Sequence, residues 1–181
     1  MAITRIAQVD VGAGGAANIT FSSIPSTYTD LMLVCMLRND SPPGTPFSAA
    51  NLVINSDTAA NYSQKYLSGN GSTTSSSSNS TLTAVYPVRT TATAATASTF
   101  ASSTIYIPNY TVATSKTISM DTVSENNAAS AAQEIVAGAW SGTATINSLS
   151  LQNLSTYLFQ IGSSATLYGI SKSGATGATV A

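Results

Sequence analysis

The sequence predicts an all-β protein built as a single antiparallel β-sandwich of about eight to ten strands. Short apolar stretches recur at roughly 10–16-residue spacing, and Ser, Gly, Asn or Pro separate them, as in sandwiches and barrels. Apolar residues recur at period two within these stretches, whereas sustained helical periodicity and helix caps are missing.

Each expected strand follows from its local pattern. Residues 30–38 are apolar on both faces, which suits a strand buried inside a sandwich. In residues 100–107, Ile105 and Ile107 share one face and Thr104 and Tyr106 share the other. The expected strands are 18–21, 30–38, 52–54, 62–67, 82–86 (ending before Pro87), 100–107, 116–123, 134–140, 145–151 and 165–170.

The remaining segments are expected to be irregular. Residues 69–80 contain only Gly, Asn, Ser and Thr, which predicts a flexible, solvated loop. Residues 90–99 contain only Thr, Ala and Ser and fit an extended connection or an edge strand. The Ala cluster within 125–137 allows a short helix or turn, but its β-rich flanks favour a connection that leads into the strand ending at Trp140.

These segments divide the chain into three parts. Residues 1–17 are expected to form an N-terminal arm, residues 18–172 the β-sandwich domain, and residues 173–181 a flexible C-terminal tail.

The composition excludes several functions. The chain has six Lys or Arg and seven Asp or Glu residues, 7% in total, where a soluble domain usually has about 25%. Because His is absent, Ser-His-Asp or Cys-His catalysis and imidazole metal sites are excluded. The formal net charge of −1 gives no electrostatic footprint for nucleic acid or an anionic membrane. Hydroxyl side chains dominate instead, with 29 Ser and 26 Thr.

No catalytic, cofactor or metal site emerges from the motifs. Cys35 lies in the apolar run 31–37 and is expected to be a small buried hydrophobe. The glycine-rich residues 12–17 lead into a strand rather than a helix, so they predict a turn and not a phosphate loop. Strand geometry separates Asp121 from Glu125 by about 13 Å, too far for a glycosidase pair. We therefore expect no enzymatic activity and no cofactor.

Aromatic residues offer one candidate binding site. Tyr62 and Tyr66 lie in a polar stretch and form the candidate exposed pair for contact with a glycan. The other aromatic residues singled out lie in more apolar surroundings and are expected to pack; they are Tyr106, Tyr110, Trp140, Tyr157 and Tyr168.

Targeting signals are also missing. The N-terminus has no apolar core of a signal peptide. The longest apolar run, residues 31–37, is too short to span a bilayer. Synthesis in the cytoplasm is the expectation.

Several phrases resemble those of a known family. They are residues 19–31 (ITFSSIPSTYTDL), 61–72 (NYSQKYLSGNGS), 105–110 (IYIPNY), 121–127 (DTVSENN) and 165–170 (ATLYGI). Together they resemble a family of small structural proteins of tailed bacteriophages. The resemblance implies a jelly-roll-like β-sandwich on the virion surface, often trimeric, and transfers no functional residue.

The expected function is that of a virion structural protein, foremost a capsid decoration (cement) protein on the phage head. A tail-fibre or receptor-binding component is the alternative, and a polysaccharide-degrading spike is the third reading. The expected partners are further copies of the chain, as a homotrimer, and other virion proteins, above all the major capsid protein. Nucleic acid and membranes are not expected partners. The protein would be made in the host bacterial cytoplasm and reside on the virion surface.

Overall fold

The computed structural model describes residues 2–42, 44, 46–126 and 130–171, which contain twelve β-strands and no helix. The predicted all-β class and antiparallel sandwich are confirmed. The strands are β1 (Ala2–Asp10), β2 (Asn18–Phe21), β3 (Asp30–Leu37), β4 (Phe47–Ile54), β5 (Tyr62–Gly69), β6 (Thr74–Leu82), β7 (Val85–Thr91), β8 (Ala101–Ile107), β9 (Lys116–Ser124), β10 (Ala132–Trp140), β11 (Leu149–Asn153) and β12 (Ser164–Ser171).

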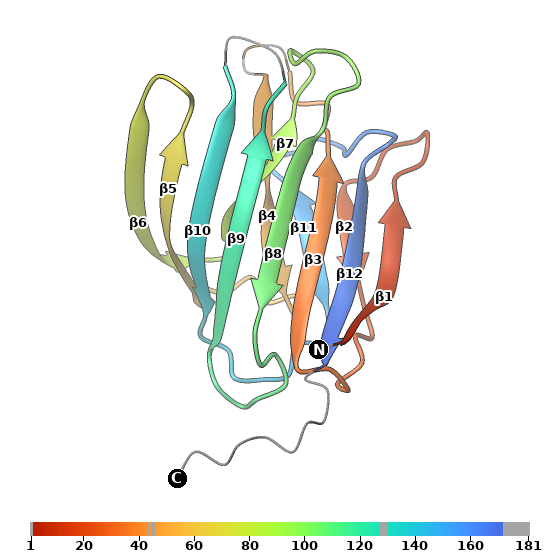
Figure 1. The fold of residues 1–181 in the computed structure, drawn as a ribbon, viewed down its shortest axis with the longest axis vertical. Coiled ribbons are helices and arrows are strands. Elements are labelled where there is room, and N and C mark those ends of the chain that lie inside the picture. Colours follow the sequence, from red (N-terminus) through yellow and green to blue (C-terminus); the bar gives the residue numbers. More distant parts are fainter. Residues whose placement is uncertain (1, 43, 45, 127–129, 172–181) are drawn as a thin grey trace.

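The strands form two sheets of unequal width. The large sheet has eight strands in the order β1-β12-β3-β8-β9-β10-β5-β6, and the small sheet has four in the order β2-β11-β4-β7. The small sheet lies behind the large one in Figure 1. Neighbouring strands are antiparallel in both sheets.

Eight of the strands follow the winding of a jelly roll. Strands β1, β2, β3 and β4 pair with β12, β11, β8 and β7, so the chain folds back on itself as one nested hairpin. Strands β2, β3 and β4 each lie in the opposite sheet to the strand before them, as do β8 after β7 and β12 after β11. Two inserted hairpins, β5–β6 and β9–β10, widen the large sheet, and β5 and β6 extend beyond the small sheet (Figure 1).

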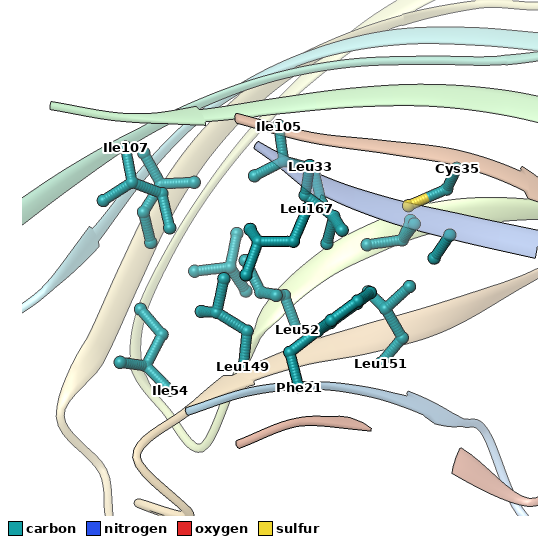
Figure 2. Close-up of a cluster of buried hydrophobic side chains, with 14 of the residues drawn as sticks. Phe21, Leu33, Cys35, Leu52, Ile54, Ile105, Ile107, Leu149, Leu151 and Leu167 are labelled. Atoms are coloured by element: carbon teal, nitrogen blue, oxygen red, sulfur yellow. The ribbon is translucent and has the colours of Figure 1, made fainter. Parts of the chain in front are cut away.

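The core is one apolar layer between the two sheets. In β3 the alternate residues Leu31, Leu33, Cys35 and Leu37 point into this layer and are buried. Burial raises the pKa of the Cys35 thiol, as expected for a cysteine that packs as a hydrophobe. Figure 2 shows how the two sheets meet across the layer, with these side chains labelled: Phe21, Leu33, Cys35, Leu52, Ile54, Ile105, Ile107, Leu149, Leu151 and Leu167. Each such side chain contributes about 1.5–3 kcal/mol by leaving water.

The expected loop over residues 69–80 is wrong, because most of it is strand. The Asn70 side-chain carbonyl accepts the backbone amides of Ser72 (3.0 Å) and Thr73 (2.8 Å), which closes a tight turn after β5. The Ser- and Thr-rich chain then pairs along β5 from Gly69–Thr74 to Gln64–Asn79. Backbone pairing needs no apolar side chain, so the Ser- and Thr-rich composition gave no indication of β6. The dipeptide Asn70-Gly71 is a hairpin signal that could have revealed it.

The N-terminal segment also differs from expectation. Residues 2–10 of the expected arm form β1, which pairs with β12 from Ala2–Ser171 to Asp10–Ser164 at the edge of the large sheet. Residues 12–15 form the expected turn, in which the Gly15 amide donates to the Gly12 carbonyl at 3.0 Å. The expected tail at 173–181 lies outside the described residues.

Strand boundaries differ in places from those expected, most clearly at Pro87. Strand β7 continues through Pro87, where the sequence predicted an end. A proline fits here because β7 is the edge of the small sheet, where one side of the backbone has no strand partner. Residues 132–140 form β10 rather than part of a helix, which confirms the preferred strand reading around Trp140.

A glycine in β12 provides a test of this packing. A Cβ at Gly169 would lie 2.3 Å from Cγ of Tyr28, so this aromatic ring occupies the space that a side chain would need. We predict that Gly169→Ala lowers the free energy of unfolding by about 1–3 kcal/mol through overpacking. Urea unfolding followed by Trp140 fluorescence measures this loss.

Gly69→Ala in β5 is the matched control, since a Cβ there meets nothing within 4 Å. It should leave stability unchanged or slightly raised. Equal effects of the two substitutions would contradict the packing of Tyr28 on Gly169.

Candidate assembly surface

The predicted exposed aromatic pair is not exposed. Tyr62 is only 2% exposed. Its hydroxyl accepts the Ile54 amide at 3.0 Å and donates to the Asp57 carbonyl at 2.9 Å, while burial raises its pKa to about 12. Tyr66 lies on the same face of β5 and packs partly against the core. Ser63 and Lys65 between them point outward, whereas Gln64 faces inward and is buried with them. This polar composition made an inward-facing pair look exposed.

Trp140 lies in the core as predicted, and it anchors the loop that joins β4 to β5. Its indole Nε1 donates to an Asp57 carboxylate oxygen at 2.7 Å. The side-chain amide of Asn61 donates to the same oxygen at 2.8 Å, and the Ala59 amide donates to the other at 2.9 Å. These hydrogen bonds, from Asn61 first and then Trp140 and Ala59, lower the pKa of the Asp57 carboxyl. The network is a structural support for one end of the sandwich.

The acidic residues considered for chemistry do not converge. Asp121 is exposed on the outward side of β9, opposite Ile135 in the register, whereas Glu134 points inward from the next position of β10. Glu134 is buried and paired with Arg89 of β7. Within the described residues, no three Cys, Asp or Glu side chains gather as a metal site would require. The part of the chain that the structure describes also has no helix that could cross a membrane.

Side chains of the large sheet bind the backbone of β7, which is an edge strand of the small sheet. The Tyr86 amide of β7 donates to the Gln64 side-chain carbonyl at 2.9 Å. The Arg89 amide donates to the Thr122 hydroxyl at 2.8 Å, and the Arg89 guanidinium pairs with Glu134. Backbone groups that have no strand partner at this edge are therefore satisfied across the sandwich.

The outward face of the large sheet, called here the outer face, is broad and poor in charge. Its rows follow from the strand register, and one row crosses seven strands in the order Thr166, Val34, Thr104, Asp121, Ile135, Leu67 and Ser76. The flanking rows are similar mixtures of hydroxyl, apolar and few charged residues, among them Tyr168, Met32, Tyr106 and Ser119 on one side and Ser164, Met36, Ser102 and Val123 on the other.

The most exposed apolar residues of this face are Leu67 and Ile135, called here the outer apolar pair. They lie directly opposite each other on β5 and β10, and are 62% and 57% exposed. Three shallow depressions, of about 550, 510 and 480 Å³, share Ile135 in their linings. Sequence reasoning missed this pair, because it expected Tyr66 to be exposed, and alternation along a strand would then turn the adjacent Leu67 inward.

Comparison with protein-family models, with curated proteins and with solved structures finds no match to this chain. The functional argument therefore depends on the surface itself.

The Asp57 network predicts an acid-sensitive stability. A carboxyl whose folded pKa is lowered stabilises the fold above its unfolded pKa, and this contribution is lost as the pH falls through the folded value. We expect Asp57→Asn to be less stable than the wild type at neutral pH, with a smaller loss of stability between about pH 5 and pH 2. Urea unfolding at several pH values, followed by Trp140 fluorescence, measures both effects.

Asp121→Asn, which also replaces one carboxylate but at an exposed position on the outer face, is the control and should leave stability at neutral pH unchanged. An Asp57→Asn profile parallel to that of the wild type would show that Asp57 contributes no acid sensitivity.

Proposed function

We propose that this protein is a structural component of a tailed-bacteriophage virion, foremost a capsid decoration protein on the head surface. The observation that carries the proposal is the outer face, a wide sheet surface rich in hydroxyl groups and poor in charge, with the outer apolar pair exposed near its β6 edge. Such a surface suits a lasting contact with another protein, because exposed apolar side chains gain free energy when covered.

The sequence phrases that resemble phage structural proteins support the same proposal. They fall on strands and on the turns that follow them, including β2, β5, β8, β9 and β12. A passive assembly role needs no catalytic group, and the proposal therefore assigns none. The proposed partners are further copies of the chain, as a homotrimer, and the major capsid protein, with the virion surface as the location.

A receptor-binding role in the tail is the second candidate, and one observation favours it. The loop between β11 and β12 exposes the apolar side chains of Leu154, Leu158 and Ile161. This loop lies at the end of the sandwich opposite to Ala2, where β1 begins (Figure 1). An apolar tip facing away from that end suits contact with a receptor.

Location on the particle distinguishes the two candidates. Electron microscopy of virions that carry a gold-labelled copy of this protein should show the label over the head. A label confined to the tail tip would contradict the decoration role and support the receptor-binding role. A particle without any label would contradict both.

The outer apolar pair should contribute to attachment. We predict that Leu67→Thr with Ile135→Thr lowers the affinity for particles lacking the protein by about 10-fold or more. The fold should survive, because both side chains are more than half exposed. Binding to stripped virions measures the loss.

Val112→Thr, which removes a similar exposed side chain in the β8–β9 loop, is the matched control and should bind as the wild type does. Unchanged binding by the double variant would show that the partner contacts another surface.

The scarcity of charge predicts how attachment responds to solvent. Exposed ion pairs weaken as the Debye length falls from about 8 Å at physiological salt to about 3 Å at 1 M salt, whereas apolar burial does not. We expect the protein to stay on virions in 1 M sodium chloride and to be released by urea, which solvates apolar and peptide groups. Sedimentation of treated virions measures retention. Release by salt alone would indicate a charged patch on the partner.

A further inference from the structure

The large sheet ends in two edge strands of equal length. Strands β1 and β6 each have nine residues and lie at opposite edges of the sheet. Because eight strands alternate in direction across the sheet, β1 and β6 run in opposite directions. Strand β6 of one copy can therefore lie antiparallel to β1 of a second copy that stands upright beside it.

The β6 edge has little of the usual protection, since its one register shift lies near its C-terminal end, between Asn79 and Leu82. Residues 74–82 contain no charge and no proline, and β6 pairs regularly with β5 over most of its length. In natural proteins, charges, prolines, bulges or covering loops normally prevent an edge strand from pairing with another chain. Without them, its unpaired backbone groups can bind a further strand. In the described chain, the one side-chain hydrogen bond to the β6 backbone is local, from the Thr81 hydroxyl to the Ser80 carbonyl. The contrast with β7, whose edge amides are bound by Gln64 and Thr122, indicates that β6 is left open.

The β1 edge is compatible with it in charge. On the outward side β1 carries Arg5 and Asp10, one of each sign, with Gln8 between them and hydrogen-bonded to both. The uncharged β6 presents hydroxyl groups to these side chains, so no like charges meet when the strands pair.

The alternation of side chains fixes a register that keeps the two sheets continuous. Beyond the register shift between Arg5 and Ala7, the two strands can meet with Gln8 opposite Ser76 and Asp10 opposite Thr74. All four residues belong to the outer face of their own sheet. A shift by one residue would turn one outer face against the other.

We propose that β6 of one copy pairs with β1 of a second copy and joins the large sheets of neighbouring copies edge to edge. Because each copy offers both edges, the contact is head to tail, and a ring of three copies leaves no open edge in the large sheets. The number three rests on the proposed homotrimer, while the choice of edges rests on the strand directions, the bare β6 edge and the register.

Cross-linking between engineered cysteines tests the choice of edges. The variant carrying Gln8→Cys and Ser76→Cys is treated with a short bis-maleimide, and the buried Cys35, with its raised pKa, stays unreactive. We expect covalent species of up to three chains, and none from either single variant. Dimers from Ser76→Cys alone would show two-fold pairing of β6 with itself and would overturn the proposal.

Charges placed on the edge provide a second test. The double variant Ser76→Lys with Ser78→Lys should be monomeric rather than trimeric in light scattering. Two lysine charges on an edge strand disfavour its pairing with another strand. The control, Thr27→Lys with Thr156→Lys, adds the same charge to exposed loops and should stay trimeric. Trimers that persist in the β6 variant would overturn the edge pairing but leave the decoration role intact, since labelling of the virion judges that role separately.

Discussion

The architecture depends on the burial of one apolar layer between two sheets of unequal width. Four strands of the small sheet face an eight-stranded partner, so the layer ends before the large sheet does. Strand β6 consequently has no fully buried residue, and the outer face holds apolar side chains that no part of the described chain covers, Leu67 and Ile135 foremost. The sparse burial of β6 is thus a consequence of the mismatch in sheet width, whereas the outer face is open because it points away from the small sheet.

A chain with few charges must satisfy its buried polar groups by other means. Here hydroxyl and amide side chains do so, as Gln64 and Thr122 do for the edge of β7. The buried pair of Arg89 and Glu134 links the two sheets at this edge, with Arg89 also lying over the Phe47 ring at 4.9 Å from its centre. Removing one partner of such a buried pair typically costs about 3–5 kcal/mol, because the other charge is left unpaired in the interior.

Sequence patterns predicted the fold well wherever side chains report on burial. The strand over residues 30–37 and the buried Trp140 and Cys35 followed from apolar patterning, but the expected burial of this strand on both faces is wrong, because Val34 and Met36 are exposed. Patterning failed where the backbone decides the structure, as in β6, whose serines pair through main-chain groups, and in β1. It also failed at Tyr62, whose polar neighbours face away from it. The outer face could not be predicted, because it requires knowing which distant strands are neighbours.

The open β6 edge and the hydroxyl-rich outer face are the features on which we base the proposal that contact with other chains completes this jelly roll. Amide hydrogen exchange along β6 tests this claim most directly. In the monomer at low concentration, the amides of residues 74–80 that point away from β5 should exchange rapidly. In the assembled protein the same amides should exchange slowly. Equal exchange of these amides in both states, with new protection only in the loops at the ends of the sandwich, would contradict the account.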